Sequence, residues 1–271
     1  MFDLHIHSKN SHDANQTVDE ICQSAIAKGF SGVAVCDHAD TWFFEKDRVF
    51  DMFANCMNEI DAARNIYGDR LEILKGIEMA EYLDRPEEAE RLLTAHTYDI
   101  VLGSVHSILY EDITDAYSRV DFSTMSVEKI NGFLRVYLEK MALMAEKTDF
   151  DVLTHLNCPL RYINGKYKRN IDFLSFKDEI YDILKTIIRR DIALEINTSG
   201  VGNFYGDFMP NEAIFRMYAD IGGKLISLGS DAHTSPYIGN AFGEAQALLS
   251  SLGLHEYCVF RKRQAQVYHF K

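Results

Sequence analysis

The stretch FDLHIHSKNSHDAN at residues 2–15 separates the possible α/β folds, because it joins the first apolar run of the chain to its first turn. The run Phe2–Ile6 is typical of a buried β-strand. The turn after it, HSKNSHDAN, lacks the glycine-rich phosphate loop that follows the first strand of a dinucleotide-binding sheet or a P-loop protein. The first unit of the chain therefore disfavours a nucleotide-binding α/β sheet and favours a barrel.

Six more short apolar runs follow, and stretches with helical spacing separate them. The predicted strands are Gly32–Cys36, Glu72–Ile77, Ile100–Val105, Asp151–Thr154, Ile192–Ile196 and Lys224–Leu228. The predicted helices are Val18–Lys28, Val49–Ile66, Pro86–His96, Val127–Lys147, Phe176–Arg189 and Pro210–Ile221. Strands that alternate with helices indicate βαβ units and a parallel sheet. We expect one α/β domain over residues 1–271, with a short strand pair around Val259 and Val267–Phe270.

The composition is that of an ordinary folded chain with an acidic surface. Apolar residues make up 47% and charged residues 25% of the 271 residues. The net charge of −13 argues against a polynucleotide or an anionic membrane as partner. The five cysteines are far apart and show no zinc-knuckle or CxxC spacing. Because no signal-like or membrane-spanning apolar run stands out either, we expect a soluble, cytoplasmic protein that is not exported.

Histidines and acids gather at the ends of the predicted strands. In a strand, residues two apart point to the same side, so the side chains of His5 and His7 project together. The active site of a barrel or an open α/β sheet lies at the C-terminal ends of its strands. The ionisable residues at these ends are His5, His7, Asp37, His38, Glu78, His106, His155, Asp231 and His233.

This concentration of ionisable groups predicts a metal centre. Burying so many of them together is prohibitive unless they are paired or bind cations. Six imidazoles and three carboxylates exceed the three or four protein ligands of one catalytic zinc ion, so we infer two or three divalent ions. The mixed nitrogen and oxygen donors suit Zn, Fe or Mn. The loop SHDA at residues 11–14 offers His12 or Asp13 as a further ligand beside His38 and His233.

With these residues in view, the sequence resembles the polymerase and histidinol phosphatase (PHP) superfamily, and within it the histidinol-phosphatase family. The resemblance runs from DLHIHS through VCDH, GIEMAEY, DIVLGSVHSI, DVLTHLNCPLRY and LEINTSG to LGSDAH. It implies a distorted (β/α)7 TIM-like barrel with a trinuclear metal centre. The implied ligands are His5, His7, Glu78 and Asp231 for one ion; Glu78, His106 and His155 for a second; and Asp13, His38 and His233 for the third.

The resemblance also implies a reaction, the hydrolysis of L-histidinol phosphate to L-histidinol and phosphate in histidine biosynthesis. Metal coordination lowers the pKa of bound water to about 7, so we expect a hydroxide that bridges the ions to attack phosphorus. The predicted catalytic residues are Glu78, Asp231, His233 and Asp37. Asp37 and His12 are candidates for the general acid, and Asp37 is also a candidate for orienting a metal ligand.

Arg161 is the predicted phosphate-binding residue. It lies six residues past His155, and a guanidinium can hold two phosphate oxygens at once. Two departures from the family pattern concern the same function: Asn157 stands where the family usually has aspartate, and no basic residue follows the NTSG turn at residues 197–200. These departures bear on the affinity for the substrate and on its identity, and Arg161 is the best candidate to bind the phosphate.

Two other interpretations belong to different functional classes. The protein could be another PHP phosphoesterase, acting on nucleotides, oligonucleotides or phosphotyrosine, although the net charge disfavours a polynucleotide. It could also be a metal-binding PHP module without catalytic activity. The second interpretation is disfavoured, because every ligand position that the resemblance implies is occupied by a suitable residue. A small phosphorylated substrate remains the favoured partner.

Overall fold

The structure, a computed structural model, describes residues 1–270, and eight strands form a nearly closed barrel at its centre. Seven run parallel in one continuous order: β1 (Phe2–Ile6), β2 (Gly32–Val35), β4 (Glu72–Ala80), β5 (Ile100–Ser104), β6 (Val152–Leu153), β7 (Ala193–Asn197) and β8 (Ile226–Gly229). The eighth, β3 (His38–Asp40), pairs with the second half of β4. Backbone hydrogen bonds from Asp231 to His5 (2.7 Å) and from His7 to Ala232 (3.0 Å) join the two ends of this order.

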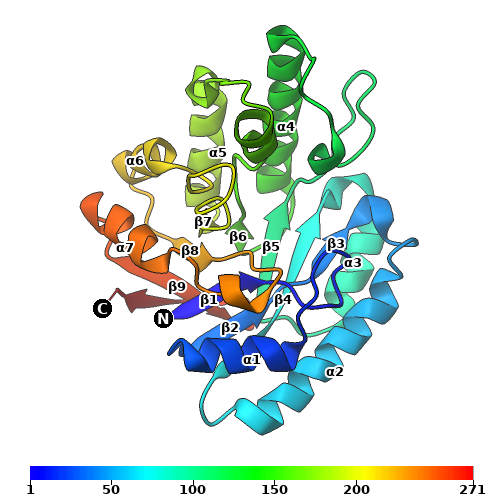
Figure 1. The fold of residues 1–271 in the computed structure, drawn as a ribbon, viewed down its shortest axis with the longest axis vertical. Coiled ribbons are helices and arrows are strands. Elements are labelled where there is room, and N and C mark those ends of the chain that lie inside the picture. Colours follow the sequence, from blue (N-terminus) through cyan, green and yellow to red (C-terminus); the bar gives the residue numbers. More distant parts are fainter. Residues whose placement is uncertain (271) are drawn as a thin grey trace.

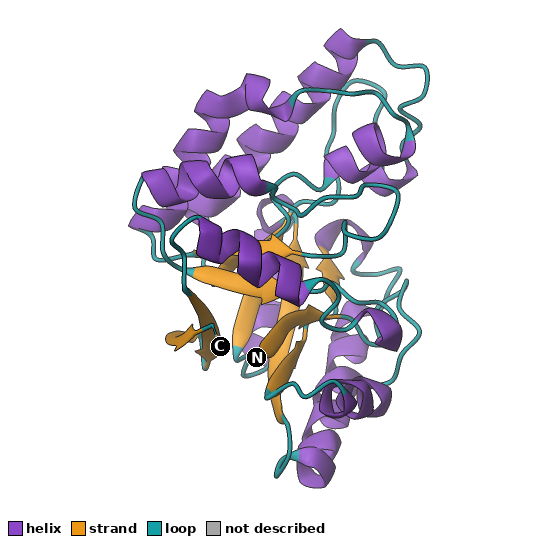
Figure 2. Cartoon of the chain, turned by 60° about the vertical axis from the view of Figure 1, so that its left-hand side comes forward, coloured by secondary structure: helices purple, strands orange, loops and turns teal. Residues whose placement is uncertain are grey.

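Helices connect the strands and surround the barrel (Figure 1). In chain order they are α1 (Val18–Ala27), α2 (Val49–Tyr67), α3 (Pro86–Ala95), α4 (Val127–Lys147), α5 (Lys177–Arg189), α6 (Glu212–Asp220) and α7 (Phe242–Ser251). Regular spacing of apolar residues explains them: α5, for example, buries Ile180, Ile183 and Ile187 along one face. Thr17 and Glu20 form a capping box that fixes the start of α1. Figure 2 shows the strands grouped between the helices.

The structure confirms the α/β barrel, and the predicted strands and helices are present with ends displaced by no more than three residues. Among the described residues, one strand and one α-helix are additional. β3 is three residues long, too short for a detectable alternation, and it forms because the nine-residue β4 extends past β2. α7 contains Gly243 in its first turn and two serines at its end, which weakens its helical signal.

The predicted C-terminal strand pair is confirmed as an antiparallel hairpin of β9 (Glu256–Arg261) and β10 (Gln264–His269). Arg261 pairs with Glu72 at the start of β4. Arg263 pairs with Asp151, just before β6, at 2.9 Å. The hairpin therefore lies at the N-terminal ends of the barrel strands, opposite the predicted ligands, and both chain ends lie near it (Figures 1 and 2).

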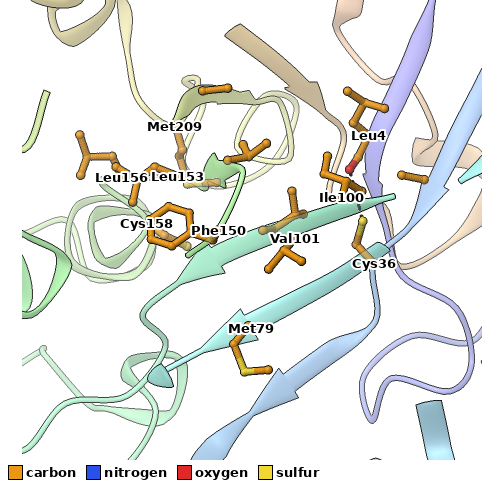
Figure 3. Packing of buried hydrophobic residues seen from close by; sticks show 14 of the residues in the cluster. Leu4, Cys36, Met79, Ile100, Val101, Phe150, Leu153, Leu156, Cys158 and Met209 are labelled. Carbon is orange, nitrogen blue, oxygen red and sulfur yellow. Dashed lines mark hydrogen bonds between the residues drawn. The ribbon is translucent and has the colours of Figure 1, made fainter. Parts of the chain in front are cut away.

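The barrel is held by a continuous apolar core. Leu4, Ile100 and Leu153 are completely buried, and Figure 3 shows them among the barrel strands, with Leu4 and Ile100 beside Cys36. Burial of this kind contributes roughly 1.5–3 kcal/mol for each large side chain. Every helix of the described part is too short or too polar to span a bilayer. This core fixes the strand ends on which the predicted ligands are mounted.

Candidate metal centre

The C-terminal ends of the barrel strands bring all the predicted ligands to one cavity of about 220 Å³. Three of them, His5, His7 and Glu78, are fully buried behind its wall. The others line the cavity itself: Asp13, His38, His106, His155, Asp231 and His233. They come from every side of the barrel, because parallel strands all end at the same rim.

Glu78, at the C-terminal half of β4, lies between two groups of imidazoles. Its Oε1 is 2.9 Å from Nε2 of His155 and 3.2 Å from Nε2 of His106. Its Oε2 faces the other way, 2.7 Å from Nδ1 of His38 and 3.5 Å from Nε2 of His5. One carboxylate thus presents a different oxygen to each group, which is the arrangement of a bridging ligand.

Two further contacts complete the groups. Nε2 of His7 lies 3.0 Å from Oδ1 of Asp231 and 3.1 Å from Nε2 of His5. The carboxylate of Asp13 lies between two imidazoles, 3.5 Å from Nε2 of His38 and 3.2 Å from Nε2 of His233. The structure therefore places Asp13 among the imidazoles of the third implied site.

His12, the alternative to Asp13, occupies a different position. Its side chain is 37% exposed, and its Nδ1 faces Asp47 at 3.8 Å. The imidazole lines the outer part of the cavity rather than the space between His38 and His233. The geometry favours Asp13 as the ligand and leaves His12 free to face a substrate.

The spacing of these donor atoms fits divalent metal ions. Four ligands held about 2.0–2.2 Å from a tetrahedral ion lie about 3.3–3.6 Å from one another. Within the implied sets, the donor atoms of Glu78 and His155 lie 2.9 Å apart, and those of His5 and Asp231 lie 3.8 Å apart. Oε2 of Glu78 is buried and has no hydrogen-bond partner among residues 1–270. Nδ1 of His38 lies close to this oxygen but outside hydrogen-bond geometry, so a cation would satisfy a buried carboxylate oxygen that otherwise lacks a hydrogen bond.

The electrostatics of the cluster agree with this fit. Burial opposes the charge of Glu78, but the imidazoles of His106 and His38 hold the pKa of its carboxyl well below the usual range. Burial, together with the neighbouring His38 and His233, lowers the pKa of His7 to about 3. A charged carboxylate and a neutral imidazole are the forms that bind metal ions. The neighbouring carboxylates, Glu78 among them, outweigh burial and raise the pKa of His5, His38 and His106, so these imidazoles would release protons on binding an ion.

Two of the six imidazoles are also oriented from behind, by carboxylates that the sequence patterns did not single out. Nδ1 of His106 lies 2.9 Å from Oδ1 of Asp40, and Nδ1 of His5 lies 2.6 Å from Oε1 of Glu195. Such partners fix the tautomer and the ring orientation of a metal-binding histidine. Asp40 shares a strand face with His38, so it could have been found had β3 been predicted.

Asp37 lies outside the cavity. It is completely buried, and its carboxylate accepts hydrogen bonds from the Ser8 backbone (2.6 Å) and from the hydroxyls of Ser8 and Ser11 (both 2.7 Å). The hydroxyl of Ser11 in turn accepts from the His38 backbone at 3.0 Å. This geometry favours Asp37 as a residue that orders the loop after β1, rather than as a general acid.

Arg161 lies at the cavity wall, at the start of a π-helical turn (η4, Arg161–Lys166). Among residues 1–270, its guanidinium donates one hydrogen bond to another side chain, a long one from Nη1 to the Ser199 hydroxyl at 3.4 Å. Its Nε is buried without a hydrogen-bond partner in the described part of the chain. Nearby Arg169 instead donates to backbone carbonyls, including that of Phe122. Arg161 is thus a cation with free donors at the mouth of the cluster.

A barrel with a carboxylate-bridged cluster of imidazoles at its C-terminal rim belongs to the class of metal-dependent hydrolases. The model of the PHP domain matches residues 3–199, and the chain therefore belongs to the PHP domain family. The matched range contains the predicted ligands from His5 to His155, and Asp231 and His233 follow it.

Curated relatives and solved structures agree with this assignment along nearly the whole chain. The probable histidinol-phosphatase of Thermotoga maritima is 26% identical, with 98% of this chain and 99% of the relative aligned. The histidinol-phosphatase of Lactococcus lactis is also 26% identical, over 95% of this chain and 93% of its own length. The crystal structure of the Lactococcus lactis histidinol phosphate phosphatase, complexed with zinc, L-histidinol and phosphate, superposes with a TM-score of 0.80 at 22% identity, covering 98% of both chains.

Proposed function

We propose that this protein is a metal-dependent phosphatase that hydrolyses L-histidinol phosphate to L-histidinol and phosphate. The observation that carries the proposal is the position of Glu78, whose two oxygens face different groups of imidazoles at the barrel rim. The relatives support the choice of substrate, because they match almost the full length of the chain and are named for this activity.

We further propose how the ligands are shared among three ions. The first set is His5, His7, Glu78 and Asp231; the second is Glu78, His106 and His155; the third is Asp13, His38 and His233. Each set contains at least one carboxylate, which offsets part of the charge of its ion. The mixed nitrogen and oxygen donors suit Zn, Fe or Mn.

Different residues of the chain would have different roles in the hydrolysis. When bound, the ions supply a water molecule of pKa about 7 and neutralise charge on the phosphate. Glu78 holds the first two ligand sets in a fixed relation. Arg161 holds the non-bridging phosphate oxygens, so that phosphorus is presented in line with its attacker. His12 lines the outer part of the cavity, where it could donate a proton to the departing alkoxide as the general acid.

The surroundings of the site agree with a small substrate. Phe43, Tyr117 and Tyr162 line the cavity beside the cluster and leave room for one compact organic group. The net charge of −13 keeps polyanions away from the rim. The five cysteines are free and buried, in keeping with the reducing, cytoplasmic setting that we propose.

Carefully purified protein should contain two or three divalent ions per chain, because nine candidate ligands surround one cavity. Elemental analysis, combined with amino-acid analysis to determine the protein concentration, gives the ratio of metal ions to protein chains. Removal of the ions with a chelator should abolish phosphate release, and Zn, Fe or Mn should restore it. A ratio of one ion or fewer in active protein would contradict the cluster.

The substrate proposal is tested by measuring phosphate release from histidinol phosphate, mononucleotides and phosphotyrosine under identical conditions. We expect the highest kcat/KM for histidinol phosphate, because the site encloses a small leaving group and excludes long polyanions. A higher value for phosphotyrosine or a nucleotide would assign the protein to another phosphoesterase class. Absence of release from all three by metal-loaded protein would favour a non-catalytic module.

A further inference from the structure

Glu195 lies in β7, completely buried behind the metal centre, and both of its oxygens are engaged. Oε1 is 2.6 Å from Nδ1 of His5. Oε2 accepts hydrogen bonds from the backbone N–H of His155 at 2.9 Å and from Nδ2 of Asn197 at 3.1 Å. His5 and His155 belong to different ligand sets of the proposed centre, so one carboxylate contacts both.

The contact with His5 determines which of its ring nitrogens faces the cluster. A carboxylate can only accept, so the proton of the imidazole lies on Nδ1. In the neutral imidazole, the form that binds a metal ion, Nε2 then keeps its lone pair, and it lies 3.1 Å from Nε2 of His7 and 3.5 Å from Oε2 of Glu78. Glu195 therefore holds His5 in the tautomer that can bind an ion of the first set.

The contact with His155 acts on the backbone. His155 has a φ of 23°, in the left-handed region that a residue with a side chain rarely adopts. Such a conformation persists only where surrounding contacts enforce it. The backbone N–H of this strained residue donates its hydrogen bond to Glu195. The Nε2 of the same residue lies 2.9 Å from Oε1 of Glu78. Glu195 thus helps to aim the imidazole of His155 into the second set.

The space for this carboxylate depends on a glycine in the neighbouring strand. A Cβ at Gly229, the last residue of β8, would lie 2.2 Å from Oε1 of Glu195 and 2.6 Å from Cβ of His5. Neither approach is possible for real atoms. The strand therefore needs glycine at this position, which brings His5 and Glu195 into direct contact.

We infer that Glu195 is a positioning residue that couples two of the ligand sets, by fixing the tautomer of His5 and the backbone of His155 with one carboxylate. The inference rests on the ligand assignment of the proposed function. It makes the first and second ions interdependent, because loss of Glu195 disturbs a ligand of each.

Glu195→Gln is the sharpest test, because the amide keeps the shape of the side chain but has only one oxygen. It cannot accept from both His5 and His155, and an amide NH2 toward His5 would reverse the tautomer. We expect the affinity of the metal-free protein for Zn or Co to fall about 10–100-fold at both sets, the range seen for partners of metal ligands. The absorption bands of the Co-loaded protein should change as well.

Two matched variants separate this role from general damage. Asp40→Ala removes the side-chain partner of Nδ1 of His106 alone, so it should weaken the second set and leave the first unchanged. Asp151→Asn replaces another buried carboxylate, which accepts from the Val101 backbone and Arg263 at the opposite end of the barrel. It should leave metal affinity unchanged. Thermal unfolding of each metal-free protein reports the structural effect.

Wild-type affinity and wild-type Co bands in Glu195→Gln would overturn the inference, and so would a loss confined to one set. If Glu195→Gln does not fold, Glu195→Asp provides the second test, because it keeps the charge and both oxygens but withdraws them by one methylene from His5 and from the backbone of His155. Metal binding is measured without substrate. A protein that binds its ions as expected but releases no phosphate would therefore contradict the proposed function and leave this inference standing.

Discussion

Replacement of Glu78 by alanine should reduce kcat/KM for phosphate esters by more than about a thousandfold. Loss of a mere partner of a metal ligand costs about 10–100-fold, and Glu78 would be a ligand of two ions at once. Its Oε1 contacts the His106–His155 pair, and its Oε2 faces the group that contains His5 and His38. Steady-state kinetics and elemental analysis on the same preparation measure both effects.

The same strand offers a control for this variant. Glu72 begins β4 at the opposite end of the barrel, where it pairs with Arg261 on the surface hairpin. Glu72→Ala should leave metal content and turnover unchanged, because it removes a partly exposed ion pair far from the cluster. Near-normal turnover of Glu78→Ala would show that the proposed metal assignment is wrong, whatever the control does.

The strand ends explain why so much of the site was predictable from the sequence. An apolar run that stops at a histidine or an acid marks both the strand and its rim, as in the runs before Glu78 and His106. Parallel strands then bring those residues together, whatever their separation along the chain. The barrel fold and the positions of eight of the nine proposed ligands follow from this rule; the ninth, Asp13, lies in the loop after β1.

The remaining parts depend on distances that no local pattern contains. His12 and Asp13 are neighbours in one polar loop, and only the positions of His38 and His233 distinguish them. Glu195 lies in a buried strand, where a carboxylate has no periodic signature. Its role depends on contacts with residues 190 and 40 positions away. Asp37 was predictable as important, but its hydrogen bonds to the Ser8–Ser11 loop were not.

Arg161 is the site residue whose predicted role can be tested most directly by kinetics. We expect Arg161→Ala to lower kcat/KM for histidinol phosphate at least tenfold, with metal content and fold unchanged. The guanidinium lies beside the cluster, and its buried Nε has no partner among the described residues, so it has donors to offer a phosphate. A charge-assisted hydrogen bond contributes roughly 1.5–3 kcal/mol, which is about one to two decades in kcat/KM. Arg161→Lys should restore only part of the loss, because lysine keeps the charge but not the planar fork.

Arg119 provides the matched control, since it lines the same cavity but is already occupied. Its guanidinium pairs with Asp115 at 3.1 Å and lies over the ring of Phe43 at 5.2 Å from the ring centre. Arg119→Ala should therefore change kcat/KM much less than Arg161→Ala does. If the phosphate were held by diffuse positive charge at the rim, both substitutions would have similar effects and lysine would replace Arg161 fully. If Arg161→Ala left the kinetics unchanged, the free donors of Arg161 would hydrogen-bond to water, and the ions alone would bind the phosphate.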